Sequence, residues 1–223
     1  MTDDRQREAA ERSPLSGIPK KHLKPIFKGT MRYTWRGVLC NKSPFDLALY
    51  SLLIWQQKPR TIIEFGTKQG GSALWFHDLC RTFGLDTRII SIDIHQRAKF
   101  AVDGVSFLSG DALDPEKALP QEFMNSLPRP LLVIDDSAHL PATVLSILRF
   151  FDSHLAVGEY VVIEDGILQS MEMEEQFDGG PLPAIRQFLA ERHASYAIDT
   201  NFCDFFGPNA TFNTNGFLVK TAA

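Results

Sequence analysis

The chain has 223 residues, of which 44% are hydrophobic and 22% are charged, and its formal net charge is −4. These are the proportions of one globular domain with its own core, and the negative charge argues against a nucleic acid as the main partner. No apolar run is long enough to span a membrane, no signal peptide is recognisable, and the three cysteines contain no C-x-x-C pair. We therefore expect a cytoplasmic protein without disulfides, structural zinc or a membrane partner.

The N-terminal residues 1–20 are polar and charged, so we expect a flexible tail ahead of a single domain over residues 21–223. A basic stretch, Lys20–Lys28, contains five basic residues when His22 is counted. Such a stretch is most often a solvated face of the protein. The alternative is a flap over an anionic or carboxylate ligand.

A regular alternation of strand and helix patterns follows a first helix, which begins at Ser43-Pro44. Two runs, Leu131–Ile134 and Tyr160–Ile163, are apolar without a break, as in strands that are covered on both faces of a parallel sheet. The last two strands flank a polar loop, which favours an antiparallel pair. We predict a doubly wound, Rossmann-like α/β fold with a seven-stranded, mostly parallel sheet and a C-terminal antiparallel pair. The expected strands are 61–65, 88–93, 105–109, 131–135, 160–164, 196–200 and 216–220, and the later helices are 71–83, 115–127, 141–154 and 182–193.

A glycine turn follows the first of these strands, in the pattern Glu64-x-Gly66-x-x-x-Gly70-Gly71-Ser72. Glycine suits such a turn because a Cβ would block both the chain reversal and the approach of a ligand to backbone N–H groups. The spacing differs from the G-x-G-x-x-G turn of NAD-binding domains. It resembles the E/D-x-G-x-x-x-G turn of class I S-adenosylmethionine (SAM) methyltransferases, although an ordinary strand–helix turn would fit the glycines too.

Acidic residues stand at or just beyond the end of every strand of the parallel core. Ligands of open α/β sheets bind beyond these carboxyl ends, so the acids should gather at one rim. Asp93 suits the ribose hydroxyls of an adenosine, and Asp111 would lie near the adenine edge; the alternative for both is a capped turn. In chain order the acids are Glu64, Asp93, Asp111, Asp135, Asp136, Glu164 and Asp165.

Three of the acids, Asp136, Glu164 and Asp165, should meet at the tips of two adjacent strands. Packed carboxylates repel one another unless a cation compensates them, and an all-oxygen set suits Mg²⁺ or Ca²⁺ rather than Zn²⁺. A solvated acidic rim is the alternative. His139 follows in the next loop, where it could take a proton from a substrate hydroxyl or simply bond the backbone.

Several motifs together resemble the cephalosporin hydroxylase (CmcI-like) family over approximately residues 33–220. The resemblance implies a class I methyltransferase fold related to the macrocin-type macrolide sugar O-methyltransferases. It implies that Asp136, Glu164 and Asp165 hold Mg²⁺ and that His139 is the general base. Ala138 departs from related sugar methyltransferases, some of which carry an acidic base there. The matching motifs are Lys42-x-Pro44-x-Asp46, the glycine turn, Asp136-Ser137-x-His139, Glu164-Asp165-Gly166 and Phe212-Asn213-x-Asn215-Gly216.

We hypothesise a Mg²⁺-dependent SAM O-methyltransferase that acts on a hydroxyl of a small molecule, such as a sugar or natural-product intermediate. One alternative is a CmcI-like iron hydroxylase, which would need two histidines and one carboxylate. Another is a SAM-fold protein that binds or rearranges its substrate without methyl transfer. The sequence leaves open the substrate and the formation of a homo-oligomer. The expected SAM-binding residues are Glu64, Gly66, Thr67, Gly70, Gly71, Ser72, Asp93, Asp111 and Asp135.

Overall fold

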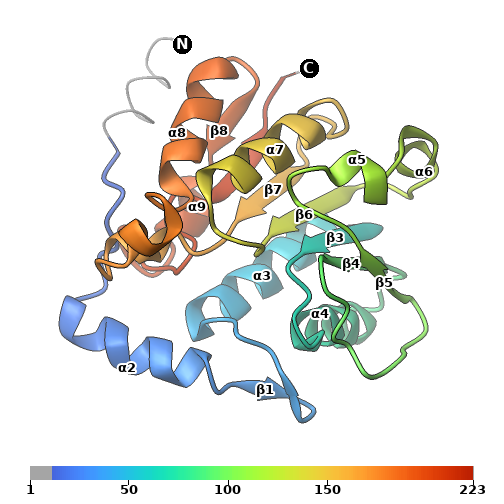
Figure 1. Ribbon diagram of the computed structural model, residues 1–223, viewed down its shortest axis with the longest axis horizontal. Coiled ribbons are helices and arrows are strands. Elements are labelled where there is room, and N and C mark those ends of the chain that lie inside the picture. The colour runs from blue at the N-terminus through green and yellow to red at the C-terminus, as the bar shows by residue number, and fades with distance from the viewer. Residues whose placement is uncertain (1–11, 223) are drawn as a thin grey trace.

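The main sheet has seven strands in the computed structural model, which describes residues 12–222 of the chain (Figure 1). They are β3 (Thr61–Phe65), β4 (Arg88–Asp93), β5 (Val105–Ser109), β6 (Leu131–Asp135), β7 (Tyr160–Ile163), β8 (Tyr196–Ile198) and β9 (Phe217–Lys220). Their order is β5-β4-β3-β6-β7-β9-β8, and the four pairings that join the first five strands in this order are parallel. β9 runs antiparallel to both of its neighbours, β7 and β8. The predicted fold and the antiparallel C-terminal pair are confirmed.

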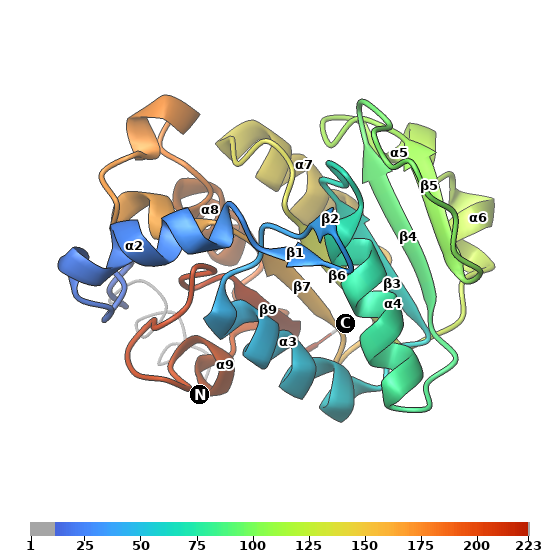
Figure 2. The same ribbon diagram turned by 90° about the horizontal axis from the view of Figure 1, so that it is seen from below.

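Helices cover both faces of this sheet. One face carries α3 (Pro44–Gln57), α4 (Gly71–Thr82) and α9 (Thr200–Cys203). The other carries α5 (Pro115–Ala118), α6 (Gln121–Asn125), α7 (Pro141–Asp152) and α8 (Leu182–Glu191). Figure 2 shows α3 and α4 on the side of the sheet opposite to α7.

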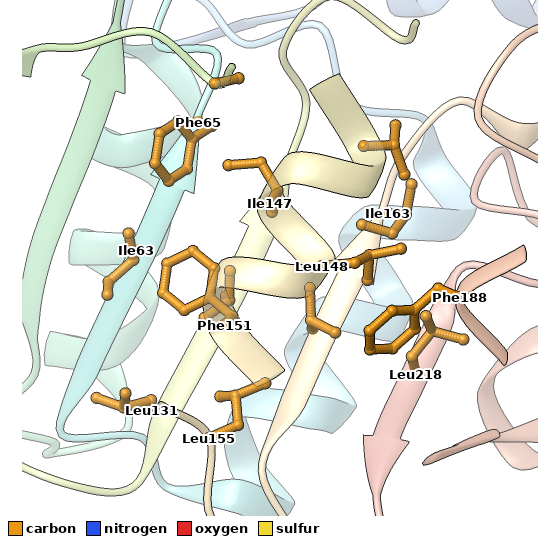
Figure 3. Close-up of a cluster of buried hydrophobic side chains, with 14 of the residues drawn as sticks. Ile63, Phe65, Leu131, Ile147, Leu148, Phe151, Leu155, Ile163, Phe188 and Leu218 are labelled. Carbon is orange, nitrogen blue, oxygen red and sulfur yellow. The ribbon is translucent and has the colours of Figure 1, made fainter. Parts of the chain in front are cut away.

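Alternate residues of the central strands serve the two faces, as the period of two in a strand requires. Ile63 and Phe65 of β3 join the cluster under α7, where the ring centroid of Phe65 lies 6.3 Å from that of Phe151 (Figure 3). Ile62, directly before Ile63, packs on the α3 and α4 side. All residues of β6 and β7 are buried, which explains why Leu131–Ile134 and Tyr160–Ile163 are apolar without a break.

The predicted helix over 115–127 is wrong as a single element, because the structure has two short helices there. Leu119 ends α5 with φ −129° and ψ 66°, and Pro120 precedes α6. A proline disfavours helical dihedrals in the residue before it and has no N–H for the helix ladder. Four strands, β3 to β6, have the predicted ends, and the ends of the other predicted elements differ by at most two residues.

The predicted N-terminal tail lies partly within the described structure. Residues 1–11 lie outside the described residues. Further along, the Arg12 guanidinium pairs with Asp204, and the Gly17 N–H donates to the Pro208 carbonyl oxygen at 2.6 Å. This part of the chain therefore contacts the loop that precedes β9.

The remaining elements lie near the carboxyl ends of the strands. The basic stretch forms α2 (Lys20–Thr30), and a two-stranded hairpin of β1 (Thr34–Trp35) and β2 (Val38–Leu39) follows it. Two 3-10 helices, η1 (Gly166–Gln169) and η2 (Glu174–Phe177), follow β7. No helix among residues 12–222 is both long enough and apolar enough to cross a membrane.

Candidate active site

The glycine turn after β3 is pressed against the tip of β6. Gly66 has φ 103°, and a Cβ on it would lie 1.9 Å from the Asp136 carbonyl oxygen. Gly70 has φ 86° and is the N-cap residue of α4. A Cβ on Gly71 would lie 2.0 Å from the Leu39 carbonyl oxygen, so the hairpin segment also requires a glycine here. The turn is therefore fixed by backbone contacts on two sides.

The start of α4 offers unpaired backbone donors. Gly70 provides no side-chain cap, so the N–H groups of the first helical turn lack an intrahelical or capping partner. Such a helix start favours an anionic or acceptor group of a ligand. Ser72 is buried within this first turn. The Thr67 hydroxyl is engaged elsewhere, because it lies 2.7 Å from the Ser91 hydroxyl.

The two acids predicted for the adenosine both shape turns. Asp93 accepts the N–H groups of Lys68, at 2.8 Å, and of His95, at 2.9 Å, so it ties the tip of β4 to the glycine turn. Asp111 accepts the Leu113 N–H at 2.9 Å after β5. Asp93 thus stands beside the glycine turn.

A buried ammonium group lies at the centre of the acids. Its burial was not predicted. Lys42 Nζ lies 2.7 Å from Asp136 Oδ2, 2.7 Å from Glu164 Oε1 and 3.7 Å from Glu64 Oε1, and the lysine side chain has no exposed surface. We call Lys42, Glu64, Asp136 and Glu164 the inner cluster. The Tyr50 hydroxyl donates to the same Glu164 oxygen at 2.6 Å.

The inner cluster has more acids than its one ammonium can compensate. Burial raises the pKa of Glu64 and of Glu164 above their ordinary values, against the opposing effect of Lys42. Burial alone would also raise the pKa of Asp136, but the charges of Lys42, Lys68 and His139 hold that pKa below its ordinary value. Asp136 is therefore the acid of the inner cluster that is best stabilised as a carboxylate.

A second group of ligating side chains lies beside the inner cluster and shares Asp136 with it. Asp136, His139 and Asp165, which we call the outer triad, each offer one ligand atom within 4.8 Å of the others. His139 Nε2 lies 3.3 Å from Asp165 Oδ2 and 4.0 Å from Asp136 Oδ1. Phe177 of η2 covers the histidine, with 5.7 Å between the ring centroids.

Both turn residues of the outer triad have strained backbones. His139 has φ 57° and Asp165 has φ 59°, a region that non-glycine residues seldom adopt. Each such conformation costs on the order of 1–3 kcal/mol and persists where the surrounding structure imposes it, often at functional sites. Burial raises the pKa of Asp165, with His139 acting in the opposite direction.

The sequence predicted a metal set of Asp136, Glu164 and Asp165, and the structure groups these residues differently. It brings Asp136 and Asp165 together with His139, whereas one oxygen of Glu164 is held by Lys42 and Tyr50. Sequence reasoning missed these two partners because lysine is rarely buried and a helical tyrosine is ordinary core. The motif around Lys42 was the one available signal.

The donor set fits a hard divalent ion. The two carboxylates of the outer triad suit Mg²⁺ or Mn²⁺, and hydroxyl or water oxygens can complete six-fold coordination, which leaves the imidazole unligated. Two buried oxygens at this rim, Glu64 Oε1 and Asp135 Oδ2, have no hydrogen-bond partner. Ser137 donates to the other oxygen of Asp135, at 2.6 Å from its hydroxyl. The rim thus has acceptor capacity in excess of its donors.

Comparisons with known proteins agree with this geometry. The family model described as rhamnosyl O-methyltransferase/CmcI matches residues 28–221. The rhamnosyl O-methyltransferase of Mycobacterium leprae is 31% identical over 191 residues, which cover 84% of this chain and 82% of the relative. The protein of the same name from Mycobacterium bovis is also 31% identical, and the alignment covers 84% of this chain and 78% of the relative.

Solved structures show the same similarity. An apo structure of CmcI has a TM-score of 0.70 at 26% identity and covers 86% of this chain and 78% of that one. A CmcI structure described with Mg and SAM has a TM-score of 0.66 at 27% identity, with the same coverage. The sequence-based resemblance is confirmed. The chain belongs to the rhamnosyl O-methyltransferase/CmcI family and is a SAM-dependent methyltransferase.

Proposed function

We propose that this chain transfers the methyl group of SAM to a hydroxyl of a small molecule, in a reaction that depends on Mg²⁺. The observation that carries the proposal is the outer triad, whose Asp136 lies directly against Gly66 of the glycine turn. A base and two metal-ligating carboxylates thus adjoin the expected position of the methyl donor. The names of the relatives support a sugar hydroxyl, such as that of a rhamnosyl group, as the acceptor.

The glycine turn and the strand tips would bind SAM. The first-turn N–H groups of α4 are suited to the carboxylate of its methionine part. Asp93 would accept the ribose hydroxyls, and Asp111 would lie towards the adenine. Glu64 and Asp135, each with an unpartnered buried oxygen, can accept further hydrogen bonds from the ligand. These residues hold the donor and take no part in bond making.

Asp136, Asp165 and His139 would act on the acceptor. A divalent ion at the two carboxylates would lower the pKa of the substrate hydroxyl and orient it. His139 Nε2, which faces both carboxylates, would take the hydroxyl proton. The oxygen lone pair then forms the new C–O bond while the S–C bond of SAM breaks, and S-adenosylhomocysteine leaves. Positioning of the two reactants would supply much of the acceleration.

The iron hydroxylase alternative is less well supported by the donor set. A facial triad of an iron oxygenase needs two histidines and one carboxylate. The triad at this rim has one histidine and two carboxylates. Oxygen-rich donors of this kind favour Mg²⁺.

Calorimetry and a coupled turnover assay test the proposal. We expect SAM to bind below millimolar concentration, and S-adenosylhomocysteine to form from SAM and an aryl rhamnoside only when Mg²⁺ or Mn²⁺ is present. EDTA should stop turnover, and added Mg²⁺ should restore it. No SAM binding at millimolar concentration, or equal turnover in EDTA, would overturn the proposal.

A further inference from the structure

Lys42 is a charged residue at this rim whose side chain is fully buried, and the proposed chemistry gives it no role. It stands directly before α3, where Ser43 caps the helix by accepting the Asp46 N–H at 3.2 Å and Pro44 occupies the first turn. The backbone of Lys42 is therefore anchored by the start of a helix. Its side chain extends from this anchor to acids at the tips of three neighbouring strands, β3, β6 and β7.

Burial of an ammonium group is costly unless excellent pairing compensates it. Lys42 meets this condition through its two contacts of 2.7 Å and the third acid at 3.7 Å. The pairing also acts in the other direction, because the ammonium holds one oxygen of Asp136 and one of Glu164 by a hydrogen bond. The arrangement is rigid, since every partner is at least nine-tenths buried.

Asp136 is shared between the two groups, and its two oxygens face different partners. Oδ2 binds Lys42 at 2.7 Å, whereas Oδ1 lies on the side of His139 Nε2, at 4.0 Å. The carboxylate orientation that presents Oδ1 to the outer triad is therefore the orientation that Lys42 holds. Lys42 and Tyr50 also hold one oxygen of Glu164, Oε1.

We propose that Lys42 is a positioning residue of the metal site: its buried ammonium fixes Asp136 so that Oδ1 faces a divalent ion bound by the carboxylates of Asp136 and Asp165. The inference rests on the proposed function, because it assumes that these two carboxylates bind that ion. Residues that orient metal ligands through hydrogen bonds typically change metal affinity by 10- to 100-fold when they are replaced.

Positioning and simple electrostatics make opposite predictions for Lys42. A positive charge close to a cation site repels the cation, so its removal would tighten metal binding if charge alone mattered. If Lys42 orients Asp136, its removal weakens metal binding although the repulsion is lost. The sign of the change in affinity therefore separates the two roles.

The experiment measures Mn²⁺ binding to the full chain without SAM or acceptor, by electron paramagnetic resonance of free Mn²⁺ and by calorimetry. For Lys42→Met, which keeps the length of the side chain but removes its charge, we expect roughly 10- to 100-fold weaker binding. Lys42→Arg should recover most of the affinity, because it restores a buried donor with a positive charge.

Lys68→Met is the matched control. Lys68 is exposed in the glycine turn, and its charge acts on Asp136 and Asp165 without a side-chain hydrogen bond to either. Its replacement removes one positive charge without releasing a ligand, so Mn²⁺ should bind equally well or more tightly. Near-ultraviolet circular dichroism checks the folding of each variant, and Lys42→Gln, with the same expected direction, replaces the Met variant if that one does not fold.

Equal or tighter Mn²⁺ binding by folded Lys42→Met or Lys42→Gln protein would overturn the inference, and so would an Arg variant no better than the Met variant. Failure of the wild-type chain to bind Mn²⁺ would instead overturn the proposed metal-dependent function. Wild-type binding with an unchanged Lys42 variant leaves that function standing and removes only the role of Lys42.

Discussion

Buried carboxylates lie at both ends of the central strands, and the two ends treat them differently. Glu159, directly before β7, has a hydrogen-bond donor on each of its two oxygens. Its Oε1 accepts the Leu131 N–H at 2.7 Å, and its Oε2 accepts the Ala156 N–H at 2.8 Å together with the Arg129 guanidinium. This acid is a structural tie between β6 and β7.

The carboxyl ends of the strands keep acceptors in reserve. One buried ammonium, that of Lys42, lies within 4 Å of three acids there. Glu64 Oε1 and Asp135 Oδ2 accept no hydrogen bond from the described part of the chain. Native proteins seldom leave buried polar atoms unpaired, so an excess of acceptors at one end calls for a ligand. Buried acids are present at both ends of the strands. The two ends differ in the balance of hydrogen-bond donors and acceptors.

The largest effect is expected from His139→Ala, which removes the proposed base but no metal-binding carboxylate. Turnover should fall by about 10²- to 10⁴-fold, the range typical of general-base catalysis, while SAM affinity stays within about twofold. Single-turnover assays and calorimetry measure the two quantities. His154→Ala is the control, since that ring packs on Phe150 of α7, with centroids 4.6 Å apart. Unchanged turnover in His139→Ala would remove the histidine from the mechanism.

Asp46 is a buried acid near the site that is held by hydrogen bonds and has no cation beside it among the described residues. Burial raises its pKa to about 6, although Ser43, Thr211 and the Phe212 N–H, at 3.3 Å, donate to it. Between its ordinary pKa of 3.8 and about 6, the folded protein holds a proton that the unfolded chain has lost. The free energy of unfolding should therefore fall as pH rises through this window, by roughly 3 kcal/mol.

Urea unfolding across this pH window, with Asp46→Asn as the reference, measures that contribution. The asparagine does not titrate, so the difference between the two proteins isolates Asp46 from the other acids. We expect the wild-type protein to lose stability relative to the variant as pH rises. Parallel pH profiles would show that the carboxyl is not held protonated in the fold.

A paired substitution tests the contrast between the two ends directly. Glu159→Gln should lower the free energy of unfolding by about 1–3 kcal/mol, because it weakens the hydrogen bonds that the buried carboxylate accepts. It should leave the affinity for Mn²⁺ unchanged. Asp165→Asn should weaken Mn²⁺ binding by about tenfold or more and cost less stability, since it relieves repulsion between acids. Thermal unfolding and Mn²⁺ titration of both variants decide the matter. Equal losses of metal affinity would contradict the contrast.

The smallest effect is expected from Phe177→Ala. The ring packs edge-on against His139, and such aromatic contacts contribute about 0.5–1.5 kcal/mol. We therefore expect a two- to tenfold fall in kcat with SAM affinity unchanged, measured in steady-state assays. A loss as large as that of His139→Ala would show that Phe177 does more than hold the imidazole ring.

Residue patterns alone were enough to predict the fold and most of the acids that gather at the rim. Unbroken apolar runs such as Leu131–Ile134 identify strands covered on both faces, whereas the break at Pro120 was missed by the single helix predicted over 115–127. Acids at strand tips could be placed at one rim because parallel strands share their carboxyl ends. His139, Asp136 and Asp165 were therefore predictable as neighbours, and the structure brings them together.

Tertiary structure alone decided how these acids are shared. No local pattern shows that Lys42 is buried, since its burial depends on acids from three strands that meet only after the sheet forms. The assignment of Glu164 to Lys42 and Tyr50 follows from the same convergence. Strand positions follow from the hydrophobicity of short segments, whereas the pairing of a buried charge depends on every group around it. For that reason the sequence located the site, and the folded chain set the partners within it.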